Sequence, residues 1–361
     1  MNIERINISQ LEEFIHTRKY LSYGIVPITP ERAWSQTKNP HAKPDDPALW
    51  VALDDSGDLL GFIGSLPAKD YRSGKRLGWN TCWWADPEKG RDAAMPLFYT
   101  FLKHWDMQVA FSDMTAHTYS IISQMGFCHT RQEQVCIAYL RFPLKEILHS
   151  AKRLTFLLSP VLTIPAVIIN LFQALRISTA GHNLKGLEME IQEEPGEEVW
   201  GFIRQYHAHE FTGRRKADFA WITIRKWLSV NSGNQQDMAE RYPFSYLCEV
   251  FEWKWIITRQ DGKIQTVMFV SLRDHVLKVL YFYGESPGFA LMALKLLVSQ
   301  DHRINKIIFG HPRLIRNRRL LNSVLILKRL KKRYTGVSKQ LLDEFPRDMV
   351  MQLGDGDAVF T

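Results

Sequence analysis

The sequence predicts an α/β (α+β) fold in which mixed, mostly antiparallel sheets are flanked by helices. Residues 49–85 contain three strand-like runs joined by polar turns, which favours antiparallel pairing of neighbours. A short polar loop, a helical pattern and another apolar strand follow the third run. From Gly186 a similar order of elements begins again, which predicts a second domain.

The first half predicts a short helix, an irregular loop and then the strands. The helix covers 10–20, with Ser9 as a candidate N-cap, and the proline-rich residues 24–49 predict the loop. Strands are expected at 49–53, 59–66 and 76–85, with a hairpin turn at 54–58. They are followed by a helix with apolar residues from 97 to 105, a strand at 107–111, a helix ending at 126 and last strands at 131–142.

Composition limits the class of protein. A chain of 361 residues with 45% hydrophobic and 23% charged side chains is long enough for two folded domains. The net charge of +8 favours anionic partners such as CoA, phosphorylated sugars, membrane surfaces or nucleic acid. Four cysteines without paired metal spacing suit a reducing compartment, and the N-terminus does not resemble a secretory signal, so we expect a cytoplasmic protein.

The loop after the strand at 76–85 has the form of an anion-binding turn. The first N–H groups of a helix lack partners within the helix, and the helix dipole adds to their attraction for phosphate. Lys89 and Arg91 would supply positive charge beside those groups. An ordinary strand-to-helix turn has the same local sequence, so the residues alone leave both readings open.

The order of elements, closing with Met125-Gly126-Phe127, resembles the fold of the GCN5-related N-acetyltransferase (GNAT) family. In that family the fourth strand leads into a pyrophosphate loop, Gln/Arg-x-x-Gly-x-Gly/Ala, which aligns here with residues 89–94. Lys89 replaces Gln/Arg, and Asp92 stands where the family has its first glycine. The resemblance implies acetyl-CoA or another acyl-CoA as co-substrate, bound by Trp84, Ala85, Lys89, Gly90, Arg91, Asp92, Ala93 and Ala94.

N-acylation also needs a base for the acceptor amine and an acid for the departing sulfur. Asp113 and His117, just after the strand at 107–111, are the candidates for the base, and Tyr119 is the candidate for the acid. The position of the family's acidic tyrosine is Ile122 here. We expect no metal site, because His207 and His209 at i and i+2 of a helix would point to different faces.

An apolar stretch at 154–175 carries no charged residue and is flanked by basic ones. Its length would span a bilayer, but two prolines and the polar Asn170 and Gln173 oppose spanning. It would also suit the interface of an anionic membrane. The third interpretation, a buried linker between domains, is the one that the sequence favours.

The second half predicts a further set of similar elements. Strands are expected at 187–191, 246–259, 263–272, 276–284 and 305–310, and helices at 197–210, 217–228 and 289–299. The whole resembles a tandem-GNAT architecture of bacterial acyltransferases, with an N-terminal domain at 1–145, an apolar linker at 146–185 and a degenerate C-terminal domain at 186–361. The segment from Phe211 to Trp221 also resembles a pattern in tandem-GNAT proteins linked to surface-polysaccharide synthesis.

Residues 311–334 form a basic run with leucines between the charges. A solvated helix face is the plain interpretation, and contact with an anionic membrane or a phosphorylated substrate is the functional one. The run contains no recognised nucleic-acid motif, so we do not expect nucleic acid as a partner.

These observations favour an acyl-CoA-dependent N-acyltransferase that acts on an amino sugar or another small amine, in surface-polysaccharide synthesis or elsewhere. A peripheral membrane contact would use 154–175 and 313–333. The alternatives are a catalytically silent tandem-GNAT binding protein, favoured by Ile122 and Asp92, and a transferase that uses aminoacyl-tRNA.

Overall fold

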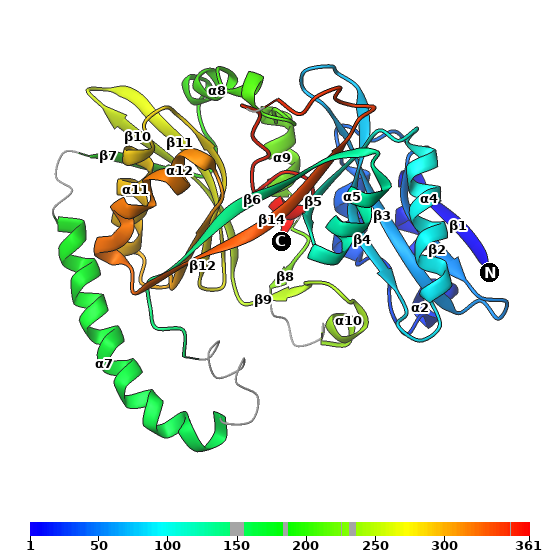
Figure 1. Cartoon of the computed structure of the whole chain (residues 1–361), viewed down its shortest axis with the longest axis horizontal. Helices are drawn as coiled ribbons and strands as arrows, with labels where there is room; N and C mark the ends of the chain where they lie inside the picture. The colour runs from blue at the N-terminus through cyan, green and yellow to red at the C-terminus, as the bar shows by residue number, and fades with distance from the viewer. Residues whose placement is uncertain (145–154, 183–186, 225, 231–235, 347) are drawn as a thin grey trace. The chain divides into compact units, whose positions relative to one another are not determined.

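The computed structural model describes residues 1–144, 155–182, 187–224, 226–230, 236–346 and 348–361 (Figure 1). They form two compact units. Unit 1 consists of Met1–Glu133, Arg204–Phe251 and Arg333–Thr361, and unit 2 of Gln134–Ile203 and Glu252–Lys332. Each unit therefore combines segments from both halves of the chain, and the domain boundaries inferred from sequence stay a prediction.

Unit 1 contains a mixed sheet in the order β1-β2-β3-β4-β5-β14-β6. All the pairings from β1 to β4 are antiparallel, whereas β4 and β5 are parallel. The strands are β1 (Asn2–Asn7), β2 (Pro47–Leu53), β3 (Leu59–Lys69), β4 (Arg76–Ala85), β5 (Val109–Met114), β6 (Cys128–Tyr139) and β14 (Leu327–Ser338). Residues of β6 and β14 belong to both units, so the two ends of each strand are described with their own unit.

Helices and short elements complete unit 1. They are α1 (Leu11–Phe14), α2 (Arg18–Ser22), α3 (Pro30–Thr37), α4 (Ala94–His104), α5 (Ala116–Met125), α9 (Lys216–Ile224), α10 (Gln236–Arg241), the small sheet of β8 (Ser229–Val230) and β9 (Leu247–Cys248), and the 3₁₀ turns η1 (Ile8–Gln10), η2 (Arg91–Ala93), η3 (His207–His209) and η5 (Ala358–Phe360). One apolar cluster joins α4 to the sheet through Leu97, Phe98 and Phe101.

Unit 2 contains a sheet in the order β6-β13-β12-β11-β10-β7. Its remaining strands are β7 (Glu188–Gln192), β10 (Phe251–Gln260), β11 (Lys263–Arg273), β12 (Val276–Tyr283) and β13 (Lys306–Phe309), and its helices are α7 (Thr155–His182), α8 (Glu197–Arg204), α11 (Pro287–Gln300), α12 (Pro312–Asn317) and the 3₁₀ helix η4 (Arg318–Val324). Buried residues of α11, such as Leu291 and Leu294, pack into one core with Met268 of β11 and Ile307 of β13.

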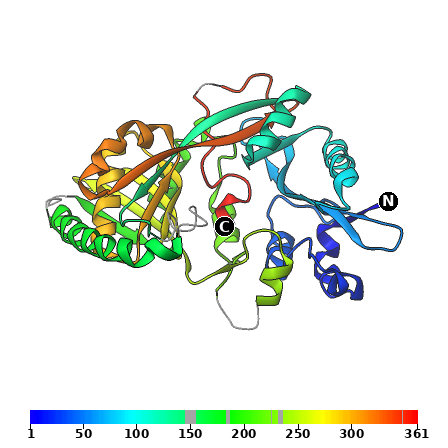
Figure 2. The same ribbon diagram turned by 60° about the horizontal axis from the view of Figure 1, so that its bottom comes forward.

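The predicted fold class is confirmed, because both units carry mixed, mostly antiparallel sheets flanked by helices (Figures 1 and 2). Both predicted hairpins are present as well. In the first, Asp54 Oδ1 accepts hydrogen bonds from the amides of Ser56 and Asp58, and Gly57 has a φ of +89°. The second turn consists of Asp261 and Gly262, both with positive φ.

Three local predictions are wrong. The helix at 10–20 is two helices, because the Thr17 side chain accepts a hydrogen bond from the Tyr20 amide and starts α2. The predicted loop at 24–49 contains α3, which Thr29 caps and in which Pro30 takes the first position. The basic run is not one helix face, since α12, η4 and β14 divide it.

Candidate functional site

The strands β4 and β5 of unit 1 separate before they end. Within the described residues, their parallel pairing joins Gly78–Asn80 to Val109–Phe111 and stops there. Beyond Asn80, β4 continues to Ala85, paired with β3 on its other side. On the side that faces β5, no described strand pairs with Thr81–Ala85.

Two buried polar groups lie where the strands separate. Across the part of the chain that the structure describes, the indole Nε1 of Trp79 and the hydroxyl of Ser112 are buried and have no hydrogen-bond partner. Trp79 lies on β4, and Ser112 follows Phe111, the last residue of β5 that pairs with β4. Both side chains lie against Gly356 of the C-terminal segment.

The loop after β4 has a close-packed base and a charged rim. A Cβ atom at Gly90 would overlap the carbonyl oxygen of Leu60, so the loop follows β3 closely only because glycine stands there. Lys89, Arg91 and Asp92 are exposed, whereas Ala93 is buried. The carbonyl of Ala94 accepts a hydrogen bond from Trp83 Nε1 at 3.2 Å.

Asp86 uses part of the hydrogen-bonding capacity of this loop. Its Oδ1 accepts hydrogen bonds from the amides of Glu88 and Lys89, at 2.9 and 2.8 Å. The bonds from Lys89 and Glu88 lower the pKa of Asp86. The Gly90 amide donates to the Asp86 carbonyl, and the Ala93 amide donates to the Gly90 carbonyl. Phosphate binding would therefore fall to the amides of Arg91 and Asp92 and to the side chains of Lys89 and Arg91.

The other predicted cofactor residues are at the open end of β4. Trp84 pairs with Phe62 of β3, and their rings stack with centroids 5.5 Å apart. Ala85 pairs with Gly61. Their backbone lies in the part of β4 that has separated from β5, so the structure brings these two positions together with the loop that follows them.

The predicted catalytic residues lie at the end of β5 and the start of α5. Asp113 has a φ of +53°, and its Oδ1 accepts a hydrogen bond from Arg333 Nε at 2.8 Å. His117 is exposed in the first turn of α5. Tyr119 is half-buried, with its ring 4.6 Å from that of Tyr334. Asp113 is therefore part of an ion pair, whereas the other two remain at the surface of α5.

A histidine–aspartate pair that sequence reasoning missed lies beside Trp79. His41 Nε2 is 2.6 Å from Asp218 Oδ1, and the Asp218 side chain is only 6% exposed. Burial opposes ionisation of Asp218, but hydrogen bonds from His41 and from the Arg215 amide lower its pKa overall. The pair borders a cavity of about 20 Å³, which is also lined by Lys69, Trp79, Thr212, Arg214 and Trp221.

One member of this pair, Asp218, lies in the segment from Phe211 to Trp221 that the sequence analysis singled out. Phe211 packs edge-on against Trp79, and Trp221 Nε1 donates to the Ser35 carbonyl at 2.7 Å. Asp218 lies in the same segment, but its partner His41 comes from the region before β2. No local pattern connects residues so far apart in the chain.

A buried charged network adjoins this segment. Gln352 Nε2 donates to Glu210 Oε1 at 2.7 Å, and Thr212 Oγ1 donates to Asp355 Oδ1 at 2.7 Å. Burial, and then the neighbouring Asp355 carboxylate, raise the pKa of Glu210 to about 8. Arg214 donates to the carbonyl of Gly356, which itself lies against Trp79 and Ser112. The network thus fixes the C-terminal segment beside the point where β4 and β5 separate.

Comparisons with solved structures identify similar folds. The chain is similar to a protein from Enterococcus faecalis V583 described as a probable N-acyltransferase, with a TM-score of 0.49 and 11% identity over 96% of this chain and 75% of that one. GCN5-related N-acetyltransferases from Anabaena variabilis (TM-score 0.46, 11% identity, 93% and 72% covered) and Kribbella flavida (0.44, 9%, 93% and 70%) are also similar. No family model and no curated protein matches the sequence.

The topology of unit 1 follows the order of elements expected from the sequence. Three antiparallel strands lead into a loop and a helix, and the next strand is parallel to the third.

The same order of elements occurs again in unit 2. The elements β10, β11, β12, α11 and β13 follow the order of β2, β3, β4, α4 and β5, and β12 and β13 are parallel. The loop before α11 differs in chemistry, however. It carries Glu285, and Arg313 donates both to that carboxylate and to the Gly284 carbonyl. An acidic, internally paired loop is a poor site for phosphate.

Ile122 explains the missing tyrosine of the GNAT-like pattern. Its side chain is fully buried in the cluster formed by α4, α5 and the sheet. A tyrosine at this position would point into the core. This position of α5 therefore offers no proton donor.

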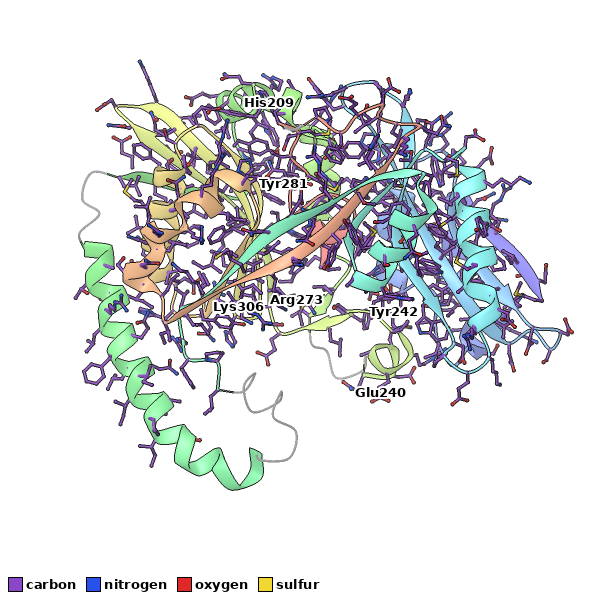
Figure 3. The ribbon with its side chains drawn as sticks, viewed as in Figure 1. His209, Glu240, Tyr242, Arg273, Tyr281 and Lys306 are labelled. Carbon is purple, nitrogen blue, oxygen red and sulfur yellow. The ribbon has the colours of Figure 1, made fainter. Side chains whose placement is uncertain are left out.

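Unit 2 also contains a cavity of about 520 Å³ between the end of β6 and α7. Tyr139, Phe142, Val167 and Lys306 are among the residues that line it, and Lys306 Nζ lies 5.0 Å from the centre of the Tyr139 ring (Figure 3). Among the described residues, no group of three His, Cys, Asp or Glu side chains is arranged to hold a metal ion.

Proposed function

We propose that the chain is an acyl-CoA-dependent N-acyltransferase with its donor site in unit 1. The observation that carries this proposal is the separation of β4 and β5 after Asn80 and Phe111. A pantetheine arm is extended and carries amide groups, so it suits the open edge of Thr81–Ala85. Lys89 and Arg91 would face the pyrophosphate, and the thioester would lie along the unpaired edge of β4.

The reaction would join the acceptor nitrogen to the thioester carbonyl carbon and break the carbon–sulfur bond. An amine proton must leave, and the CoA sulfur must gain one, so that an amide and a free thiol result. His41, held by Asp218 at 2.6 Å, is the base that the geometry supports, because Asp113 is already paired with Arg333. The Trp84 and Ala85 amides would polarise the carbonyl, and Tyr119 stays the proposed acid.

The acceptor we propose is an amino sugar or another small amine. The cavity beside His41 is about 20 Å³, enough for the reacting amine and not for a whole sugar. The rest of the acceptor would therefore extend away from the cavity. A role in surface-polysaccharide synthesis remains a proposal that stems from the segment Phe211 to Trp221, whose residues line this cavity.

The repeated order of elements in unit 2 supports a tandem-GNAT architecture with one donor site. The acidic loop at Glu285 supports unit 1 as the half that binds CoA. An acyl-CoA donor would place unit 1 in the cytoplasm.

A catalytically silent binding protein is the second candidate. Asp86 occupies two amides of the loop, and the buried Ile122 replaces the family's acidic tyrosine. Such a protein would bind acyl-CoA, or another anion, without transferring the acyl group.

Calorimetric titration with acetyl-CoA tests the proposal, using the wild type and the Arg91→Glu variant. The matched control is Lys103→Glu, an equal charge reversal at the other end of the helical segment. We expect micromolar binding by the wild type and the control, and binding at least about tenfold weaker in Arg91→Glu. Absence of wild-type binding would overturn the donor site, whereas binding without turnover of any amine would favour the silent protein.

A further inference from the structure

The helix α7 exposes an apolar stripe. Its outward side chains recur at helical spacing and are 49–67% exposed: Ile164, Val167, Ile168, Leu171, Phe172 and Leu175. We call these six residues the α7 face. A surface helix of a water-soluble protein normally turns such a stripe towards the core. The interpretation of the stretch 154–175 as a buried linker is therefore wrong for its described side chains, 163–175; its side chains from 154 to 162 lie outside the described residues.

The polar side chains of α7 point the opposite way, into unit 2. Asn170 Oδ1 accepts a hydrogen bond from the Phe142 amide, and the buried Gln173 donates to the Val324 carbonyl. Arg176 donates to the carbonyl of Asn322 at 2.8 Å. Towards unit 2 the helix therefore presents these polar groups together with the buried Ala166 and Ile177, whereas its outward stripe is apolar.

A basic segment packs against α7 through η4. Residues 311–332 contain eight Lys or Arg and no Asp or Glu. Six of the eight are exposed, and none of these six forms an ion pair with another described residue: Arg316, Arg319, Lys328, Arg329, Lys331 and Lys332. Asn322 connects the two regions, since it accepts hydrogen bonds from Arg176 of α7 and from Lys328.

The ribbon shows the same neighbourhood. Figures 1 and 2 show η4 and the start of β14, both orange, beside the green α7. Leu320, Leu327 and Leu330 are also 40–51% exposed between these basic residues. Apolar side chains with interspersed cations are the composition of a surface that binds the headgroup region of an anionic bilayer.

We propose that the α7 face and the six basic residues dock unit 2 on an anionic lipid bilayer, with α7 lying in the plane of the interface. The apolar side chains enter the boundary between headgroups and acyl chains, and the cations contact lipid phosphates. This proposal does not depend on acyl-CoA, because it concerns a surface of unit 2 alone.

The geometry favours lying in the interface over spanning. By length and composition, the window Thr163–Ala180 of α7 could cross a membrane. In this structure, however, Asn170, Gln173 and Arg176 hold one side of it to unit 2 by hydrogen bonds. Spanning would break these bonds and leave the polar groups in hydrocarbon, which is costly. Only the outward side of the helix is free to meet lipid.

The test is sedimentation of the purified full chain with vesicles. One set contains phosphatidylcholine and phosphatidylglycerol in equal amounts, and the other contains phosphatidylcholine alone. We expect binding to the anionic vesicles, weaker binding to the neutral ones, and release as the salt rises to about 1 M, where the screening length falls to ~3 Å. This salt and lipid dependence of the wild type needs no variant to fold.

Two double variants separate the apolar and the charged contributions. Leu171→Asp with Phe172→Asp should weaken binding to anionic vesicles by about tenfold or more. The matched control is Leu21→Asp with Ile224→Asp, which changes side chains in unit 1 of similar exposure, 60% and 68% against 64% and 67%. Lys328→Glu with Arg329→Glu should weaken binding to anionic vesicles only, and Arg18→Glu with Lys103→Glu is its control.

Other results would overturn the proposal. Equal binding to both vesicle types, or none, would exclude an anionic interface. The wild type could instead form a dimer and bind no vesicles. If the Leu171→Asp, Phe172→Asp variant were then monomeric, the α7 face would be a contact between copies of the chain. Resistance of vesicle-bound protein to alkaline carbonate would indicate insertion across the bilayer. In each case acetyl-CoA titration reports separately on unit 1.

Discussion

The Nε atom of Arg333 lies 2.8 Å from Oδ1 of Asp113, and the Arg333 side chain is only 4% exposed. The same guanidinium donates to the carbonyls of Met351 and Gln352 and contacts Glu133. In the sequence, Arg333 ends a basic run and Asp113 follows an apolar strand. The fold places the buried guanidinium against a carboxylate that is 46% exposed. Asp113 is therefore already engaged, and His41 is the better candidate for the base.

Replacement of Arg333 by methionine should lower the free energy of unfolding by about 1–3 kcal/mol. It leaves the carbonyls of Met351 and Gln352 without their donor, and the partly exposed carboxylates of Asp113 and Glu133 without their cation. Arg329→Met removes an exposed arginine from the same strand and should change stability by no more than ~0.5 kcal/mol. Urea unfolding of both variants measures the difference. Equal stability of the two would show that the Arg333 pairs contribute nothing net.

Replacement of His41 by alanine should reduce acyl transfer by about 10²–10⁴-fold if the imidazole removes the amine proton. The control is His209→Ala, since His209 forms a similar pair with Asp348 at 3.1 Å but both side chains are more than half exposed (Figure 3). Steady-state rates with saturating acetyl-CoA give the comparison. Acetyl-CoA affinity should be unchanged in both variants.

If His41→Ala loses activity and also unfolds at a clearly lower temperature than the wild type, the histidine has a structural role instead. The acyl-transfer rate of the Asp218→Asn variant is a second test. The Asp218 carboxylate bonds His41 and the Arg215 amide at the start of α9, so we expect it to affect the rate by positioning His41. A full rate in both variants would exclude the pair from catalysis.

The pKa of Glu210, raised to about 8 by burial and by the Asp355 carboxylate, predicts a pH-dependent stability. Between the ordinary value of 4.5 and about 8, the folded chain keeps this proton while the unfolded chain loses it. The contribution of Glu210 to folding is therefore most favourable below pH 4.5 and is lost as the pH rises through 8.

The slope expected from this one group is at most ~1.4 kcal/mol per pH unit. Glu210→Gln keeps an acceptor for Gln352 and removes the titration, so its stability should fall less than that of the wild type between pH 5 and 8. Urea unfolding at several pH values makes the measurement. Parallel curves for the two proteins would contradict the raised pKa.

Replacement of Gly90 by alanine should destabilise unit 1 by about 1–3 kcal/mol, because the new Cβ would overlap the Leu60 carbonyl oxygen. Gly24→Ala is the matched control, since nothing lies within 4 Å of its Cβ position. Thermal unfolding compares the two. If Gly90→Ala is as stable as the control, the loop can move away from β3, and its description as close-packed is wrong.

Local patterns were sufficient for several elements. Residues close together in sequence predicted the strands β2, β3 and β4, the turns at 54–58 and 261–262, and the loop that leads to α4. The patterns were the alternation of apolar and polar residues, glycine at positive φ, and the helical spacing of apolar residues. The edge strand β1 was missed because its polar residues hide the alternation, and α3 because the prolines suggested a loop although Thr29 and Pro30 form a helix start.

The sequence by itself determined the class of fold, the order of most elements and the loop at 86–94, because these follow from residues close together in the chain. Only the tertiary structure decided which side chains meet: His41 with Asp218, Arg333 with Asp113, and Glu210 with Gln352. It alone decided that α7 faces outward, since an apolar helix has the same sequence whether protein covers it or not. Burial and long-range contact depend on the whole packing, which no local pattern records.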